Sequence, residues 1–196
     1  MVKLKNGRTV LLVMTAVAAL SLTACGRNNS AQEQTTTPVQ TTIQETTTKK
    51  EVALSDIHEA VKAVYGENYI PSMLFDAQYI TDVFGVTEDM YEEAIAVGPM
   101  ISAHVDTFAA FKAKEGQAEA IEQKLTEYKD YLLNESFQYP MNIPKIEAAQ
   151  IVREGDYVFY VQLGQAENTA AEEDELLKQF QESNQLAVDA IREQLQ

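Results

Sequence analysis

Cysteine and tryptophan are almost missing from this sequence, which has one cysteine and no tryptophan among 196 residues. A single cysteine excludes an intramolecular disulfide and any multi-cysteine metal site. Histidine is also scarce, with two residues, so a zinc site would need carboxylate ligands. No P-loop, Gly-x-Gly-x-x-Gly fingerprint or Gly-x-Ser-x-Gly elbow occurs, and we therefore expect no cofactor.

Basic residues are half as common as acidic ones. The chain has 15 Lys and Arg against 30 Asp and Glu, a formal net charge of −15. Such a chain is repelled by nucleic acid and by anionic lipid headgroups, so we expect no nucleic-acid partner. The same charge also suits a domain that must stay soluble outside the cell.

Residues 1–24 have the three parts of a bacterial signal peptide. Lys3, Lys5 and Arg8 form a positive start, residues 10–20 an apolar core, and small residues precede the expected cut. A helix needs ~20 mostly apolar residues to cross a bilayer, and this run is shorter. The sequence therefore predicts an export signal rather than a transmembrane anchor.

The one cysteine, Cys25, ends the run Leu22-Thr23-Ala24-Cys25, which is typical of a lipobox. A cysteine thiolate is a strong nucleophile and can form a thioether to a diacylglyceryl group. Two acyl chains, such as palmitate, hold a protein stably on a membrane. We expect a lipoprotein anchored through Cys25 on the outer face of the cell membrane; the alternative is an ordinary secretory signal with a chance cysteine.

Removal of the predicted signal would make the protein more acidic, and lipidation of Cys25 would leave it without a free thiol. The signal contains three of the 15 basic residues and no acidic one, so 12 basic and 30 acidic residues remain, a formal net charge of −18. Because Cys25 would carry lipid, the mature chain would have neither a disulfide nor a catalytic cysteine.

Residues 25–52 are rich in threonine and glutamine. This composition cannot bury enough apolar surface to offset the entropy of ordering, so we predict a disordered tether that starts at Cys25. About 26 residues have a coil span of about 25–30 Å and a stretched limit of about 90 Å. The folded domain would therefore stand within about 90 Å of the membrane.

Residues 53–196 are long enough for one domain with its own core. Apolar periodicity and breaks at Gly and Pro predict helices, strands and loops in alternation. The predicted helices are 53–65, 78–84, 117–133 and 170–196, with a helical turn at 87–91; the predicted strands are 93–97, 100–113, 148–152 and 157–163, and 137–144 is a predicted loop.

This order predicts an α+β fold, with a small antiparallel sheet backed by helices and a C-terminal helix. Two β-hairpin units lie on either side of the long helix at 117–133. Gly155 suits the turn of the second hairpin because it is free to take positive φ. Strand 157–163 is apolar on both faces, so it should be central or covered.

Two sets of residues are candidates for metal or catalytic chemistry. His104 and Asp106 are two apart, and on a strand they would share a face, where they could hydrogen-bond or bind a metal. The set Glu88, Asp89, Glu92 and Glu93 offers oxygen ligands that suit calcium. The ordinary alternatives are a structural His–Asp pair and a solvated acidic face, and the acidic spacing does not match an EF-hand loop.

Two further features have ordinary alternatives as well. His58 lies in the first predicted helix, where we expect it to face solvent. Tyr139-Pro140, together with Tyr157, Phe159 and Tyr160, could line a groove for a peptide or a glycan. Packing in the core and at the sheet edge is the alternative for these rings.

Five segments carry a resemblance to a known family. They are residues 91–95, Gly98-Pro99-Met100-Ile101-Ser102-Ala103-His104-Val105-Asp106, residues 125–131 of a charged helix, the pair Tyr139-Pro140, and Val152-Arg153-Glu154-Gly155-Asp156-Tyr157-Val158. The chain resembles, over roughly residues 54–163, the DUF4358 type of domain of unknown function, found in lipoproteins of Gram-positive bacteria. The resemblance implies a surface lipoprotein, and it implies no activity and no functional residues.

These observations predict a non-enzymatic binding or interaction module at the cell surface. Its partner would be a protein, a peptide or a cell-wall component, and the lipid on Cys25 would hold it at the membrane. The alternative is a carboxylate-based enzyme of the cell-wall zone, which would use two of the many acidic residues. A transporter's binding component usually needs two lobes, and this chain is short for that role.

Overall fold

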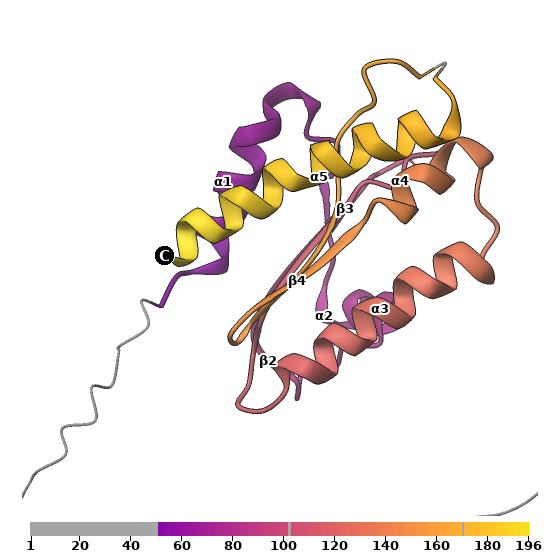
Figure 1. Ribbon diagram of the computed structural model, residues 1–196. Coiled ribbons are helices and arrows are strands. Elements are labelled where there is room, and N and C mark those ends of the chain that lie inside the picture. The colour runs from indigo at the N-terminus through magenta and orange to yellow at the C-terminus, as the bar shows by residue number, and fades with distance from the viewer. Residues whose placement is uncertain (1–50, 102, 170) are drawn as a thin grey trace, which may run out of the picture. The chain divides into compact units, whose positions relative to one another are not determined.

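The computed structural model describes residues 51–101, 103–169 and 171–196. Its centre is a five-stranded antiparallel sheet in the order β1-β2-β3-β5-β4 (Figure 1). The strands are β1 Met73–Leu74, β2 Tyr91–Gly98, β3 Thr107–Ala113, β4 Gln150–Glu154 and β5 Tyr157–Gln162; the helices are α1 Leu54–Tyr65, α2 Ala77–Phe84, α3 Ala118–Asn134, α4 Ile143–Glu147 and α5 Glu173–Leu195, with 3-10 turns at Gly66–Asn68 and Pro140–Asn142. The predicted α+β fold is confirmed, including the hairpins on either side of the long helix and the C-terminal helix.

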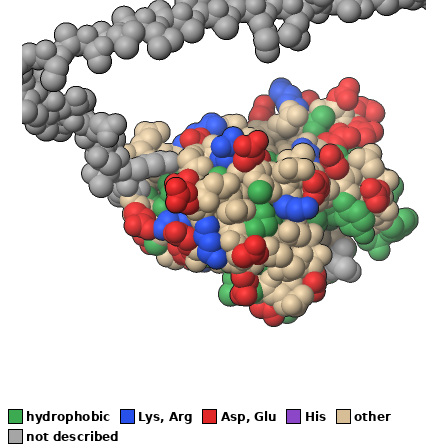
Figure 2. All heavy atoms as spheres, turned by 90° about the horizontal axis from the view of Figure 1, so that it is seen from below, with side chains coloured by type: hydrophobic (Ala, Val, Ile, Leu, Met, Phe, Trp, Pro, Cys, Tyr) green, Lys and Arg blue, Asp and Glu red, His purple; other side chains and the backbone are tan. Residues whose placement is uncertain are grey.

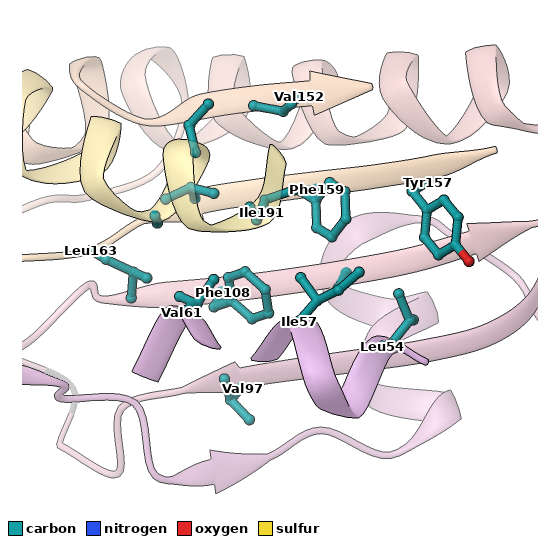
Figure 3. Close-up of a cluster of buried hydrophobic side chains, with 14 of the residues drawn as sticks. Leu54, Ile57, Val61, Val97, Phe108, Val152, Tyr157, Phe159, Leu163 and Ile191 are labelled. Atoms are coloured by element: carbon teal, nitrogen blue, oxygen red, sulfur yellow. The ribbon is translucent and has the colours of Figure 1, made fainter. Parts of the chain in front are cut away.

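Helices cover both faces of the sheet. α1 and α5 pack on one face, and α2 and α3 pack on the other (Figure 1). Successive side chains of a strand point to opposite faces. Phe159 of β5 therefore joins Ile57 and Ile191 in the first core, whereas Tyr160 joins Leu125 in the second (Figure 3 shows the first core).

β5 is buried along its whole length, as the prediction of a central strand requires. It lies between β3 and β4, and its two faces contribute to the two cores. This burial explains why its sequence is apolar without alternation.

Local signals define the ends of several helices. Asp76 caps α2, because its carboxylate accepts a hydrogen bond from the N–H of Tyr79 at 2.8 Å. Gly85 ends α2 with φ +67°, a conformation that glycine adopts without a Cβ penalty. Three acidic residues lie in the first turn of α5, where the helix dipole favours negative charge.

The strand register divides the sheet into two ends. Gly98, Thr107 and Gln162 lie at one end, which we call the loop end, because Thr107 pairs with Gln162 and Val97 with Phe108. The other end, the hairpin end, contains the β4–β5 turn and the pair Tyr91–Ala113.

The domain begins at the hairpin end. There the N–H of Val52 donates to the hydroxyl of Tyr157 at 3.0 Å, and Glu51 forms an ion pair with Lys112. The predicted signal, Cys25 and the Thr/Gln-rich segment lie outside the described residues.

Several element boundaries differ from the predictions. β3 begins at Thr107, so 100–106 is a loop and only the second half of the predicted strand is a strand. Residues 87–90 form a turn that leads directly into β2, not a helical turn. The predicted loop at 137–144 contains a 3-10 turn and the start of α4, and the two-residue strand β1 was not predicted. These elements are short and are held by tertiary contacts, which sequence periodicity does not report.

Among the residues that the structure describes, no helix combines the length and the apolar character that a membrane span needs.

Candidate functional site

Three connections meet at the loop end of the sheet. Residues 99–106 join β2 to β3, residues 135–142 join α3 to α4, and the segment from Leu163 to Glu172 joins β5 to α5. The antiparallel register brings them together, because the end of β2, the start of β3 and the end of β5 are neighbours. Binding residues are often found on loops that a rigid sheet positions.

A cavity of about 480 Å³ lies between these connections. This volume is within the range of small-molecule sites, roughly 300–1,000 Å³. Its wall is largely apolar, with a few polar side chains; the lining residues are Ile70, His104, Asp106, Met141, Asn142, Lys145, Gln165, Ala166, Thr169, Leu176 and Phe180.

Asp106 and Lys145 form a buried ion pair at this cavity. Lys145 Nζ donates to Asp106 Oδ2 at 2.9 Å, with the two side chains 11% and 1% exposed. The ammonium also lies over the ring of Phe180, 5.1 Å from its centroid, in a cation–π contact. Loss of either partner would leave a buried charge without compensation.

The second carboxylate oxygen of this pair has no partner. Asp106 Oδ1 is buried and makes no hydrogen bond within the described part of the chain. A buried polar atom without a partner costs about 1–3 kcal/mol, more when it is charged. Asp106 therefore lies at the wall of a cavity with one carboxylate oxygen that lacks a hydrogen-bond donor among the described residues.

Hydrogen bonds from distant elements hold the loop that contains Asp106. The hydroxyl of Tyr160 donates to Gln162 Oε1 at 2.6 Å, and Gln162 Nε2 donates to the carbonyl of Val105. Asn142 Nδ2 donates to the carbonyl of Ala103 at 3.2 Å. Burial, and then the nearby Tyr128, raise the pKa of Tyr160 well above its usual value, so its hydroxyl stays a neutral donor.

The structure places His104 and Asp106 at the same cavity, but not on a strand as predicted. Both side chains line the cavity, but they precede β3 in a loop and do not share a strand face. The charged partner of Asp106 is Lys145, which lies 39 residues away in α4. Sequence reasoning missed Lys145; the only local signal was a lysine between the apolar residues Pro144 and Ile146.

His104 also borders a second cavity, of about 410 Å³. This cavity lies between the 99–106 loop, α2 and α3, and its wall includes Phe75, Tyr128 and Leu132. Burial raises the pKa of Tyr128 to about 12, with a smaller effect from Tyr79. None of the described residues that line this second cavity forms an ion pair, so the first cavity is the better candidate for specific recognition.

The acidic set at residues 88–93 does not form a metal centre. Glu92 pairs with Lys112 of the adjacent strand at 2.8 Å, and Asp89 accepts from the hydroxyl of Thr87. Across the described ranges, no group of three or more His, Cys, Asp and Glu side chains is arranged to hold a metal ion. These carboxylates lie on a turn and a strand, not on the predicted helical segment.

The prediction that His58 faces solvent is wrong. Its ring is half-buried and stacks on Phe108 with 5.3 Å between centroids, and its Nε2 lies 2.8 Å from the hydroxyl of Tyr69. Burial lowers the pKa of His58, and the Lys62 ammonium lowers it further, against a smaller opposite effect of Glu59.

The candidate aromatic groove is not formed, and core packing, the alternative, holds for three of its rings. Tyr157 and Phe159 lie in the core under α1 and α5, and Tyr160 lies in the core under α3, so these three rings are structural. Only Tyr139 remains at the surface, where its ring contacts Phe137 with 6.0 Å between centroids.

Exposed apolar side chains surround the loop end. Phe137 is 88% exposed, Met100 77% and Met141 72%, with Ile101 and Tyr139 also exposed. Figure 2 shows hydrophobic side chains gathered at the right-hand end of the domain, whereas charged side chains are spread over the rest of that face. Contiguous exposed apolar surface next to a cavity is typical of a binding site.

The fold and this site define a class: a three-layer α+β domain with a candidate ligand cavity at one end of its sheet. The chain belongs to the family described as Domain of unknown function (DUF4358), which matches residues 64–163. That range contains all five strands of the sheet, and it contains both Asp106 and Lys145. Searches of curated proteins and of solved structures each found no match.

Proposed function

We propose that this protein is a lipid-anchored extracytoplasmic lipoprotein whose acidic domain is a binding module at the cell surface. The observation that carries the binding role is Asp106 at the wall of a cavity of about 480 Å³, a buried carboxylate with one oxygen that has no hydrogen-bond partner among the described residues. The lipobox at Cys25 and the signal in residues 1–24 support the location.

The position of the cavity on the domain supports the combination of a membrane anchor with a binding role. The described chain starts at the hairpin end, next to Tyr157 and Lys112, whereas the cavity lies at the loop end. The seven residues of β3 separate these ends by about 20 Å at ~3.3 Å per residue. An anchor attached before Glu51 would therefore leave the cavity accessible to partners.

The composition of the cavity wall favours binding over carboxylate catalysis. Glycosidase chemistry needs two carboxyl groups on either side of the bond that breaks. Among the described residues that line the cavity, Asp106 is the one carboxylate, and its partner is a lysine.

The anchor is tested with the Cys25→Ala variant of the full chain in a bacterial host. We expect loss of fatty-acid labelling and loss of membrane association, because alanine has no thiol to receive the lipid. Cys25→Ser is a closer match in size and should behave in the same way. Continued labelling of either variant would refute the lipobox interpretation.

The binding role is tested by photo-crosslinking in intact cells. A photoreactive residue at Met141, on the cavity wall, should give a discrete adduct. The same group at Glu193, an exposed position near the other end of α5, is the control and should give none. Ala166→Phe, which places a bulky ring on the cavity wall, should abolish the adduct at Met141. An adduct unaffected by this change would argue against the cavity as the binding site.

A further inference from the structure

From the same cavity, and resting on the proposed binding function, we infer the class of ligand: a short peptide without net charge, with an amide donor and acceptor side by side and an apolar side chain. Its N–H would satisfy Asp106 Oδ1, and its carbonyl would accept from Lys145 Nζ. One peptide group carries both the N–H donor and the C=O acceptor.

The Asp106–Lys145 pair has no net charge, which disfavours ligands that carry a net charge. Asp106 and Lys145 neutralise one another, so a ligand with a net charge would lose its hydration without gaining an unmatched opposite charge. An uncharged amide loses much less hydration on entry. A zwitterion would have to desolvate two charges next to an ion pair that is already complete.

The hydrogen-bonding capacity of the pair fits one amide group. Lys145 has three N–H donors, of which Asp106 Oδ2 takes one, and no other hydrogen bond of this ammonium is present within the described residues. Asp106 Oδ1 accepts no hydrogen bond from the described residues. Because Oδ1 is buried, side chains on the cavity wall would have to rotate before a ligand N–H could reach it.

The rest of the wall suits an apolar side chain. Ile70, Leu176 and the ring of Phe180 form apolar wall, and the exposed Met141 lies at its edge. Methionine adapts its shape to different apolar partners. A cavity of about 480 Å³ has room for a peptide of a few residues.

Four leucine derivatives, which share the same side chain and differ in their charges, test this inference. They are N-acetyl-leucine N-methylamide (uncharged), leucinamide (cation), N-acetyl-leucine (anion) and leucine (zwitterion). Binding is followed by amide chemical-shift changes in the NMR spectrum of the full chain without its signal. We expect the uncharged probe to bind at least tenfold more tightly than each other probe, with shifts at His104, Asp106 and Ala166.

Two variants place the binding in this cavity. Asp106→Asn removes the carboxylate but can weaken the fold, because it leaves Lys145 without its counter-charge. Ala166→Phe fills the cavity at a half-buried loop position and leaves every charge in place. Asp82→Asn, at an exposed position on α2, is the matched control for the charge change. Ala166→Phe and Asp106→Asn should each lower the affinity for the uncharged probe at least tenfold, and Asp82→Asn should leave it unchanged.

Each remaining outcome overturns a defined part of the inference. If a charged probe or leucine binds best and Ala166→Phe blocks it, the cavity is a binding site and the ligand class is wrong. If the uncharged probe binds equally to Ala166→Phe, or if no probe shifts the cavity resonances, the peptide inference fails. The proposed binding function would then still depend on its own crosslinking result at Met141.

Discussion

The hydroxyl of Tyr157 satisfies both main-chain polar groups of Val52, although 105 residues separate the two in the chain. It accepts from the N–H of Val52 at 3.0 Å and donates to its C=O at 2.9 Å. Both residues are buried. This double hydrogen bond fixes the first residues of the domain to the β4–β5 hairpin and so determines where any preceding segment leaves the fold.

Tyr157→Phe should therefore destabilise the domain by about 1–3 kcal/mol, because the change leaves a buried donor and a buried acceptor without partners. Urea denaturation followed by circular dichroism measures this as a lower midpoint with an unchanged slope. Tyr139→Phe, at a half-exposed position, is the control and should change stability by less than about 0.5 kcal/mol. Equal effects of the two changes would show that the Val52 contact has no stabilising role.

A buried asparagine on α5 connects three elements. Asn184 accepts from the N–H of Leu163 at 2.8 Å and donates to the carbonyl of Ala148 at 2.9 Å. Asn184→Leu should cost about 2–4 kcal/mol, since both main-chain groups lose their partner in the core. Gln181→Leu introduces the same side chain at an exposed position of α5 and serves as the reference. Equilibrium unfolding of both variants measures the difference in the free energy of unfolding. An Asn184→Leu variant that is as stable as the natural chain would contradict the expectation.

Gly164 lies where the chain passes close to α5. Its φ is +96°, and an added Cβ would lie 2.6 Å from the Cβ of Ser183 and closer still to its Oγ. Gly164→Ala should cost about 3 kcal/mol or more, because backbone strain and a steric clash combine. Gly66→Ala is the matched control: Gly66 also has positive φ, but a Cβ there would meet nothing within 4 Å.

The Gly66 variant should show the backbone cost alone, about 1–3 kcal/mol, because φ +54° with ψ −124° is a conformation that residues with a Cβ rarely adopt. Thermal unfolding of both variants separates the two contributions. A cost of equal size at Gly66 and Gly164 would mean that the contact with Ser183 relaxes freely.

His58 should make stability depend on pH. Burial lowers the pKa of His58 below its ordinary value near 6.5, so the unfolded chain binds the proton first as the pH falls. The contribution of neutral His58 is complete above about pH 6.5 and is lost as the pH falls through the lower pKa of the folded state. The charged or titratable groups that face this ring are Lys62, Glu59 and Tyr69.

His58→Gln lacks this titration, so its free energy of unfolding should decrease less than that of the natural chain between pH 7.5 and pH 5. Denaturant titrations at several pH values measure the difference, and His104 is present in both proteins. Parallel pH profiles would show that burial of His58 is not linked to folding.

The sequence predicted most of the regular elements because long periodic segments depend on local spacing. Helix 117–133 became α3 and the segment 170–196 became α5, within a few residues at each end. The second hairpin followed from Gly155 between two apolar runs. Strand 100–113 was too long, because its apolar residues up to Val105 belong to a loop whose shape depends on Gln162 and Asn142.

The candidate site was predicted only in part. His104 and Asp106 were singled out, but the partner expected for Asp106 was the neighbouring histidine, not Lys145. No spacing rule connects Asp106 with a lysine 39 residues away, since their contact depends on where folding places α4 relative to the loop before β3. His58 was assigned to the surface because a helix face cannot be oriented before its contacts with Phe108 and Tyr69 are known.

The sequence by itself determined the acidic balance, the order of the longer helices and strands and the central position of β5, and it predicts a lipid anchor at Cys25. These depend on composition and on patterns between near neighbours in the chain. Only the tertiary structure decided the two helical layers, the cavity at the loop end and the buried pair of Asp106 and Lys145. The reason is that burial and charge pairing depend on residues that folding brings together from distant segments.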